Sequence, residues 1–290
     1  MVYPQTGGGR VRERNDRLVN SILITLLCVL GAIFLIPVVL VLLNSFKSRL
    51  YISAAPFELP DSVTFVGLQN YLTGLMTAGF PAAFGRSVFI TVASVALILL
   101  GTSMTAWYIV RMNTRFTRLL YYLFVFSMVV PFQMVMYTMT YIVGSLGLDN
   151  TVGIVPVYLG FGAGLSVFMF AGFVRAIPLE IEEAATIDGA GPLQTFFRIV
   201  LPVMRPTAIT VAILNAMWVW NDYLLPYLVL GTRHKTIPVT IQISMQGAYG
   251  ATDYGGLMAM LVLAIIPIII FYLACQKYII KGVIAGAVKG

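Results

Sequence analysis

The stretch that decides the fold of this chain is EEAATIDGAGPLQTFFRIVLP (residues 182–202), a polar interval between two long apolar segments. Acidic residues crowd its start, where the positive end of a helix dipole favours them, and Pro178 upstream suits a first helical turn. Gly189 provides the backbone freedom that a sharp turn needs, and Pro192 then opens a second helix. The pattern predicts two short helices joined by a tight turn, the second ending at Pro202.

The second of these helices carries one apolar face. Its members follow the i, i+3, i+4, i+7, i+8 spacing: Leu193, Phe196, Phe197, Val200 and Leu201. The first helix offers Ala184 and Ala185, where a partner could approach the backbone closely. A loop this short cannot bury an apolar face by itself. It must therefore pack against the rest of its own chain or against another protein.

The composition of the whole chain places this loop in a membrane protein. Of the 290 residues, 59% are hydrophobic and only 10% are charged, whereas soluble domains carry about 25% charged residues. A net charge of +7 would suggest nucleic acid as a partner of a soluble chain, but in a membrane protein basic residues set the orientation. We therefore expect an all-α integral membrane protein that does not bind nucleic acid.

An apolar helix needs roughly 20 residues to cross a bilayer. Six segments meet that length, at about residues 19–43, 87–110, 119–143, 152–174, 207–230 and 257–280. The first run is too long for the apolar part of a signal peptide, so we expect a permanent span and no cleaved leader. Pro37, Pro131 and Pro267 would allow bent helices. Residues 1–290 are thus predicted to form one transmembrane domain.

The basic residues orient these spans. With the N-terminus in the cytoplasm, most of the 18 Lys and Arg residues lie inside, as the positive-inside rule requires. The outside then holds Lys47, Arg49, Arg86, Arg233 and Lys235. Both termini and the loop at residues 176–206 are predicted to be cytoplasmic.

Two segments predicted to lie outside the cell are longer than simple connecting loops. Within residues 45–86, four apolar residues fall on one helical face and predict an interfacial helix: Leu68, Leu72, Leu75 and Met76. Residues 231–256 form a polar, glycine-containing loop that could contact an external partner.

Motifs for catalysis, nucleotide binding or metal binding are absent from the sequence. There is no GxxxxGK[ST] phosphate loop, and His234, the one histidine, has no metal-ligand spacing around it. Cys28 and Cys275 both lie in apolar runs and fit inert thiols better than a disulfide. We expect no catalytic residue, cofactor site or metal site in this chain.

Polar residues at membrane depth are costly and are therefore candidates for a transport pathway. Asn215, Trp218 and Asp222 share one helical face with Asn221 close by, and Gln133 lies in the third span among methionines and tyrosines. Such amides, carboxylates and aromatic faces can bind sugars. The structural alternative, in which these residues join helices or lie at the membrane boundary, is the stronger reading of each one alone.

The letters of the opening loop also match a family pattern. They read Glu183, Ala184, Ala185, three residues, Gly189, nine residues, Ile199, one residue, Leu201 and Pro202. This resembles, at every defined position, the EAA loop of permease subunits of binding-protein-dependent ABC importers. In that family the first helix of the loop docks in a groove on a cytoplasmic ATPase subunit. The resemblance implies that these residues couple ATP hydrolysis to the spans, within a type I importer permease fold.

Further segments are similar to the carbohydrate-uptake branch of that family, and to its six-span, maltose-type permease. They are WNDYLLPYLVL (residues 220–230), PFELPDSVTFVGLQNY (56–71), GLDNT (147–151) and GAVKG (286–290). The resemblance implies a bacterial or archaeal plasma-membrane protein that transports a sugar. Its partners would be a second permease in a heterodimer, two ATPase subunits that bind ATP and Mg²⁺, and an extracytoplasmic solute-binding protein.

Two alternatives stay open at this point. An ABC permease for a non-sugar solute would share the EAA loop. An ion-coupled secondary transporter would need titratable groups within the membrane, of which Asp222 is the one carboxylate in a predicted span, and it would leave the loop unexplained.

Overall fold

The computed structural model of the chain describes residues 8–77, 79–246 and 253–287, with side chains described over 19–76, 79–245 and 253–278. These residues form helices joined by turns, with one isolated β-bridge between Lys47 and Phe65. The predicted all-α class is therefore confirmed. Chain contacts define two compact units: unit 1 comprises Met1–Gly74 and Asp253–Val262, and unit 2 comprises Leu75–Thr252 and Leu263–Gly290. A single domain over residues 1–290 stays a prediction.

Four helices are long and apolar enough to cross a membrane: α1 (Gly8–Asn44), α4 (Phe80–Met112), α7 (Ile154–Val174) and α14 (Tyr254–Ala287). Two bent helix pairs would bring the number to six. Four of the predicted spans therefore coincide with continuous helices. Pro37 and Pro267 both lie inside continuous helices.

The third predicted span, residues 119–143, is one of the bent pairs. It is divided between α5 (Arg115–Ser127) and α6 (Phe132–Ser145), which meet at 107°. Pro131 stands directly before α6 and supplies no backbone N–H, so the break occurs where the sequence allows it. At the end of α5, the chain approaches Gly164 of α7 so closely that an added Cβ would lie 2.8 Å from the carbonyl oxygen of Phe124.

The prediction of a continuous fifth span over residues 207–230 was wrong in detail. The helix α11 (Arg205–Asn221) ends at Asp222, which is extended, and α12 (Leu224–Leu230) begins as a separate helix. The Oδ1 atom of Asp222 accepts hydrogen bonds from the backbone N–H groups of Leu224 and Leu225, at 3.0 and 3.3 Å. The carboxylate therefore caps a new helix start within the apolar segment.

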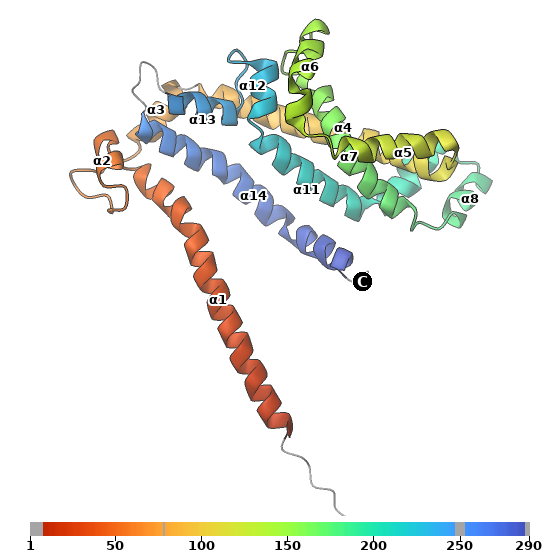
Figure 1. Cartoon of the computed structure of the whole chain (residues 1–290), viewed down its shortest axis with the longest axis horizontal. Helices are drawn as coiled ribbons and strands as arrows, with labels where there is room; N and C mark the ends of the chain where they lie inside the picture. The colour runs from red at the N-terminus through yellow and green to blue at the C-terminus, as the bar shows by residue number, and fades with distance from the viewer. Residues whose placement is uncertain (1–7, 78, 247–252, 288–290) are drawn as a thin grey trace, which may run out of the picture. The chain divides into compact units, whose positions relative to one another are not determined.

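The core of unit 2 is built mainly from α4 and α7, which pack side by side, with α11 against both (Figure 1). One buried cluster includes Ile98, Ala106, Val167, Phe170 and Val211. A second buried cluster joins α4, α7 and α11 to α6 and α12. The helices α6 and α12 lie next to each other (Figure 1). Two of the shorter helices are α3 (Gln69–Thr77) and α13 (Ile237–Gln246), of which α13 packs on α4.

Unit 1 contains α1, the short helix α2 (Arg49–Ala54) and a loop fixed by side chains. Asn70 donates from Nδ2 to the carbonyl oxygens of Ser45 and Lys47, each at 2.8 Å. The Nζ atom of Lys47 is buried and donates to the carbonyl oxygen of Ala55 at 2.7 Å. The predicted interfacial helix corresponds to α3, and Leu72 and Met76 on its apolar face are exposed.

Candidate functional site

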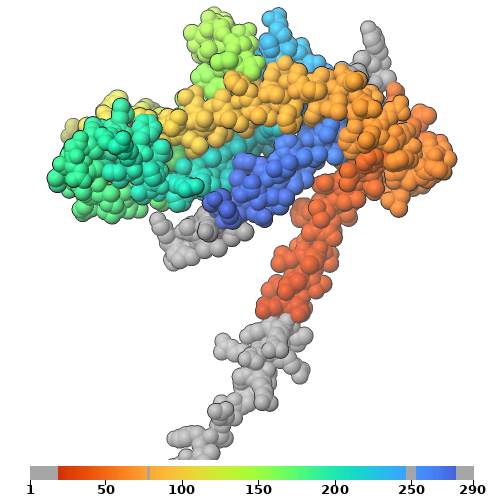
Figure 2. All heavy atoms as spheres, turned by 180° about the vertical axis from the view of Figure 1, so that it is seen from behind, coloured from red at the N-terminus to blue at the C-terminus, as the bar shows by residue number. Residues whose placement is uncertain are grey.

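The loop predicted to be functional folds at one end of unit 2, where the space-filling view shows it as a green-to-teal group beyond the end of α4 (Figure 2). Its first helix is α8 (Glu180–Ile187), and the second comprises α9 (Pro192–Thr195), the π-helix η1 (Phe196–Val200) and α10 (Leu201–Val203). Glu180, Glu182 and Glu183 occupy the first turn of α8, as their charge predicts. The two-helix prediction for this loop is therefore confirmed.

The turn between the two helices depends on Gly189. Its φ angle of +84° lies in the left-handed region, which side chains with a Cβ atom rarely adopt. The N–H of the following residue, Ala190, donates back to the carbonyl oxygen of Ala185 at 2.9 Å, which closes the end of α8. Gly191, by contrast, has an ordinary φ of −72°.

Two details of the second helix differ from the sequence prediction. The helix continues through Pro202 to Val203, because the turns before this proline widen and the N–H of Leu201 donates to the carbonyl oxygen of Phe196. The expected apolar face is also divided. Phe196 and Val200 are fully buried, whereas Leu193 is 62% exposed.

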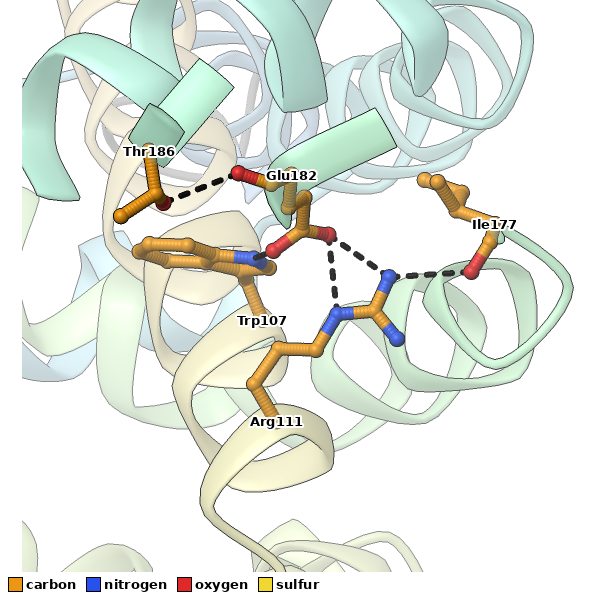
Figure 3. Close-up of polar contacts among 5 residues, drawn as sticks. All are labelled: Trp107, Arg111, Ile177, Glu182 and Thr186. Atoms are coloured by element: carbon orange, nitrogen blue, oxygen red, sulfur yellow. Dashed lines mark hydrogen bonds and ion pairs between the residues drawn. The ribbon is translucent and has the colours of Figure 1, made fainter. Parts of the chain in front are cut away.

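Glu182 is the residue that ties α8 to the rest of unit 2 (Figure 3). Its Oε1 atom accepts two hydrogen bonds from Arg111 on α4, from Nε at 2.8 Å and from Nη2 at 2.6 Å. Its Oε2 atom accepts a hydrogen bond at 2.9 Å from Nε1 of Trp107, one turn earlier on α4. The same Nη2 atom also donates to the carbonyl oxygen of Ile177 at 3.0 Å. Arg111 therefore holds both α8 and the turn that precedes it.

This ion pair is shielded from water. The side chains of Glu182 and Arg111 are 9% and 19% exposed, and the Trp107 ring packs against Phe196 with ring centroids 5.4 Å apart. Breaking such a pair by removing one partner typically costs about 3–5 kcal/mol, because the other charge stays buried and unpaired. Within the residues that the structure describes, it is the one salt bridge between side chains.

The opposite side of α8 is exposed in the part of the chain that the structure describes. Glu183 and Ala184 are exposed, and Ile187 is 86% exposed. Leu179, just before the helix, and Ile181 are also largely exposed. An anchored helix thus presents an apolar surface beside acidic residues, as protein interfaces do.

The structure places the other EAA-loop residues in supporting positions. Ala185 lies on the buried side of α8, Ile199 and Leu201 are half-buried, and Pro202 is exposed. The predicted coupling residues therefore divide into an exposed group, led by Glu183 and Ala184, and a packed group.

Of the candidate pathway residues, Trp218 and Asp222 meet around Tyr158 of α7. The Tyr158 hydroxyl donates to Oδ2 of Asp222 at 3.1 Å, and the rings of Tyr158 and Trp218 meet edge to face at 5.4 Å. Asn215 is buried deeper, where its Nδ2 atom donates to Ser166 Oγ at 3.1 Å. These contacts join α7 to the α11–α12 segment.

The other two candidates lie apart from this group. Gln133 is exposed on α6, and Asn221 donates to its own helix at the carbonyl oxygen of Met217. Asn221 lines a pocket of about 410 Å³ in unit 2 between α4, α11 and the Leu263–Ala287 part of α14. Apart from Asn221 and Thr91, the lining is apolar or aromatic, with Trp220 as its largest ring.

Sequence reasoning missed the anchor of α8. Arg111 was considered only as one of the basic residues that set orientation, and Glu182 only as a first-turn acid. The two residues are 71 positions apart, so no local spacing connects them. One feature of the sequence could have suggested the pair: Glu182 and Arg111 both lie near the ends of spans, on the side predicted to be cytoplasmic. Among the described residues, no group of His, Cys, Asp and Glu could hold a metal ion.

Comparison with known proteins identifies the family of the chain. The family model for binding-protein-dependent transport system inner membrane components matches residues 97–285, which include the α8 loop. The chain is 37% identical to the probable starch degradation products transport system permease protein AmyC of Thermoanaerobacterium thermosulfurigenes, over 93% of this chain and 98% of the relative. It is 36% identical to the multiple sugar-binding transport system permease protein MsmG of Streptococcus mutans, over 91% and 95% of the two chains.

A solved structure supports the fold. A chain of a bacterial ABC transporter involved in the import of the acidic polysaccharide alginate superposes with a TM-score of 0.75. The match covers 95% of this chain and 99% of that one, at 22% sequence identity. Together with the family match and the two relatives, this shows that the chain belongs to the binding-protein-dependent transport system inner membrane components, the permease subunits of ABC importers.

Proposed function

We propose that this chain is the transmembrane permease of a sugar importer, and that α8 couples its spans to an ATPase. The observation that carries the proposal is the division of α8 into two sides. Glu182 fixes one side to α4 through Arg111 and Trp107, while Ile187 and Glu183 on the other side are exposed. A helix held this firmly can transmit a push from a bound partner to a long apolar helix.

The proposed substrate class rests on the relatives. Their names specify starch degradation products and multiple sugars, and a third relative, 31% identical, is the diacetylchitobiose uptake system permease protein NgcG of Streptomyces coelicolor. We infer that this chain also moves a sugar or a short oligosaccharide. Gln133, Asn221 and Trp218 are the proposed pathway residues with exposed side chains.

The proposed assembly follows from the family and from the sequence. The chain would pair with a second permease, receive its substrate from an extracytoplasmic solute-binding protein, and use two ATPase subunits that hold ATP and Mg²⁺. Both termini and the α8 loop would face the cytoplasm of a bacterial or archaeal cell. Hydrolysis of ATP would belong to the partner subunits, because the sequence has no phosphate-binding loop.

Co-purification tests the docking of α8. Ile187→Asp places a charge at the centre of the exposed face without touching the Glu182 anchor, so the ATPase subunit recovered with the permease in mild detergent should fall several-fold. Phe57→Asp is the matched control, since Phe57 is 78% exposed in unit 1, far along the chain from α8. Equal recovery of the ATPase from Ile187→Asp and the control would contradict docking through this face.

A further inference from the structure

A second site lies where three candidate spans begin or end. A pocket of about 370 Å³ opens between the last turn of α4, the start of α5 and the residue after α7. Its polar lining consists of Asn113, Arg118, Tyr121, Tyr122 and Arg175. Neither the transport pathway nor the α8 anchor uses any of these side chains.

The charge of this pocket is uncompensated. None of its lining residues is acidic, and neither Arg118 nor Arg175 forms an ion pair within the described part of the chain. The guanidinium of Arg175 lies 5.0 Å above the centre of the Tyr121 ring, which restricts its position beside the pocket. Two guanidinium groups and two phenol hydroxyls offer several donors to one anion, and arginine donors suit phosphate oxygens best.

The location of the pocket indicates whether the bound anion is a free ion or part of a lipid. Arg175 directly follows the apolar helix α7, and Asn113 directly follows α4, so the pocket lies at the level where a span leaves the hydrocarbon region. Next to Arg118, α5 exposes an apolar row at the i, i+4, i+7 positions Leu119, Leu123 and Phe126, each more than half exposed. The polar pocket is therefore continuous with a surface that suits an acyl chain.

We propose that this pocket binds a phosphate group presented as the head group of an anionic phospholipid. The two arginines and the two tyrosines would hold the phosphate, and the α5 row would contact the acyl chain. Basic pockets between membrane helices are a recognised form of head-group site. An inorganic phosphate ion would satisfy the arginines but would leave the apolar row without an occupant.

Photocrosslinking from the edge of the pocket tests this proposal. A photoreactive benzoylphenylalanine replaces Leu119, which is 56% exposed beside Arg118, in the full chain. The protein is extracted with its accompanying subunits and reconstituted in vesicles of equal parts phosphatidylglycerol and phosphatidylcholine. We expect the crosslinked lipid to be enriched in phosphatidylglycerol. Because each surface arginine contributes roughly a fivefold preference for anionic lipid, Arg118→Gln with Arg175→Gln should bring the ratio close to that of the bulk lipid.

Three controls make the result decisive. Arg115→Gln removes one charge from the start of α5 without lining the pocket, so it should lower the enrichment less than Arg118→Gln alone does. Arg175→Lys keeps the charge and should retain most of the enrichment. A crosslinked lipid ratio equal to the bulk ratio in the Arg-containing protein would overturn the proposal. So would loss of enrichment on adding inorganic phosphate but not sodium chloride of equal ionic strength, because the pocket would then prefer the free ion.

Discussion

At the residue scale, Glu182 makes the connection between α8 and α4. Its carboxylate accepts hydrogen bonds from three N–H donors, two on Arg111 and one on Trp107. The neighbouring Glu183, which the family pattern marks, has no side-chain hydrogen bond among the described residues. Two adjacent glutamates therefore lie in different environments, since Glu182 is buried and Glu183 is exposed.

A double-mutant cycle would measure the anchor. Glu182→Gln and Arg111→Gln each leave one buried charge without its partner, so each should destabilise the protein by about 3 kcal/mol. The double variant should lose less than the sum of the two by about 1–3 kcal/mol, because the pair is then absent as a whole. Chemical unfolding in detergent, followed by tryptophan fluorescence, provides the measurement. Additive effects would show that the two charges are not coupled.

The two glycines of the α8 turn offer a matched comparison. Gly189→Ala forces a Cβ atom into the left-handed region at φ +84° and should cost about 1–2 kcal/mol. Gly191→Ala at φ −72° should be close to neutral, since neither position has another atom within 4 Å of the added Cβ. Thermal unfolding of the two variants side by side tests this. Equal midpoints would mean that the turn does not need its glycine.

At the scale of elements, the sequence predicted where helices lie better than where they break. Continuous apolar runs such as α4 and α7 were found because twenty apolar residues have few alternatives in a membrane. The break at Asp222 was missed because hydropathy stays high on both sides of it. The interruption depends on a capping bond and on Tyr158 of another helix, which no local pattern shows. The π-helix before Pro202 was also missed. The spacing of hydrophobic residues does not distinguish a widened helical turn from an α-helical one.

The α11–α12 break leads to a prediction about Asp222. If this carboxylate caps α12, Asp222→Ala should lower stability by about 1–2 kcal/mol through the lost cap alone. Asp222→Asn keeps an acceptor oxygen and should retain most of the stability, with the KM for sugar uptake nearly unchanged. Thermal unfolding of the two variants measures the stability, and uptake assays at matched expression measure the KM. A large rise in KM for Asp222→Asn would instead place this residue in the substrate pathway.

At the scale of the whole molecule, the sequence predicted the class of fold, the loop and the family resemblance. The composition indicates a membrane protein. The EAA pattern lies within one loop, so a single sequence is enough to recognise it. The connection between the loop and α4 could not be predicted, because it joins residues 71 positions apart through side-chain geometry. The same limit applies to the candidate pathway residues Asn215 and Trp218, whose contacts depend on the packing of α7 against α11.

In the proposed mechanism, α8 transmits movement of an ATPase to the spans through its exposed face and its anchor. The most direct test is ATP hydrolysis by the reconstituted transporter, with and without the sugar-loaded binding protein. Glu183→Gln and Ile187→Asp should each lower the stimulated rate roughly tenfold, equivalent to about 1.4 kcal/mol, while Phe57→Asp should behave as the unaltered chain. Stimulation at the unaltered rate in both α8 variants, with normal membrane insertion, would contradict the claim.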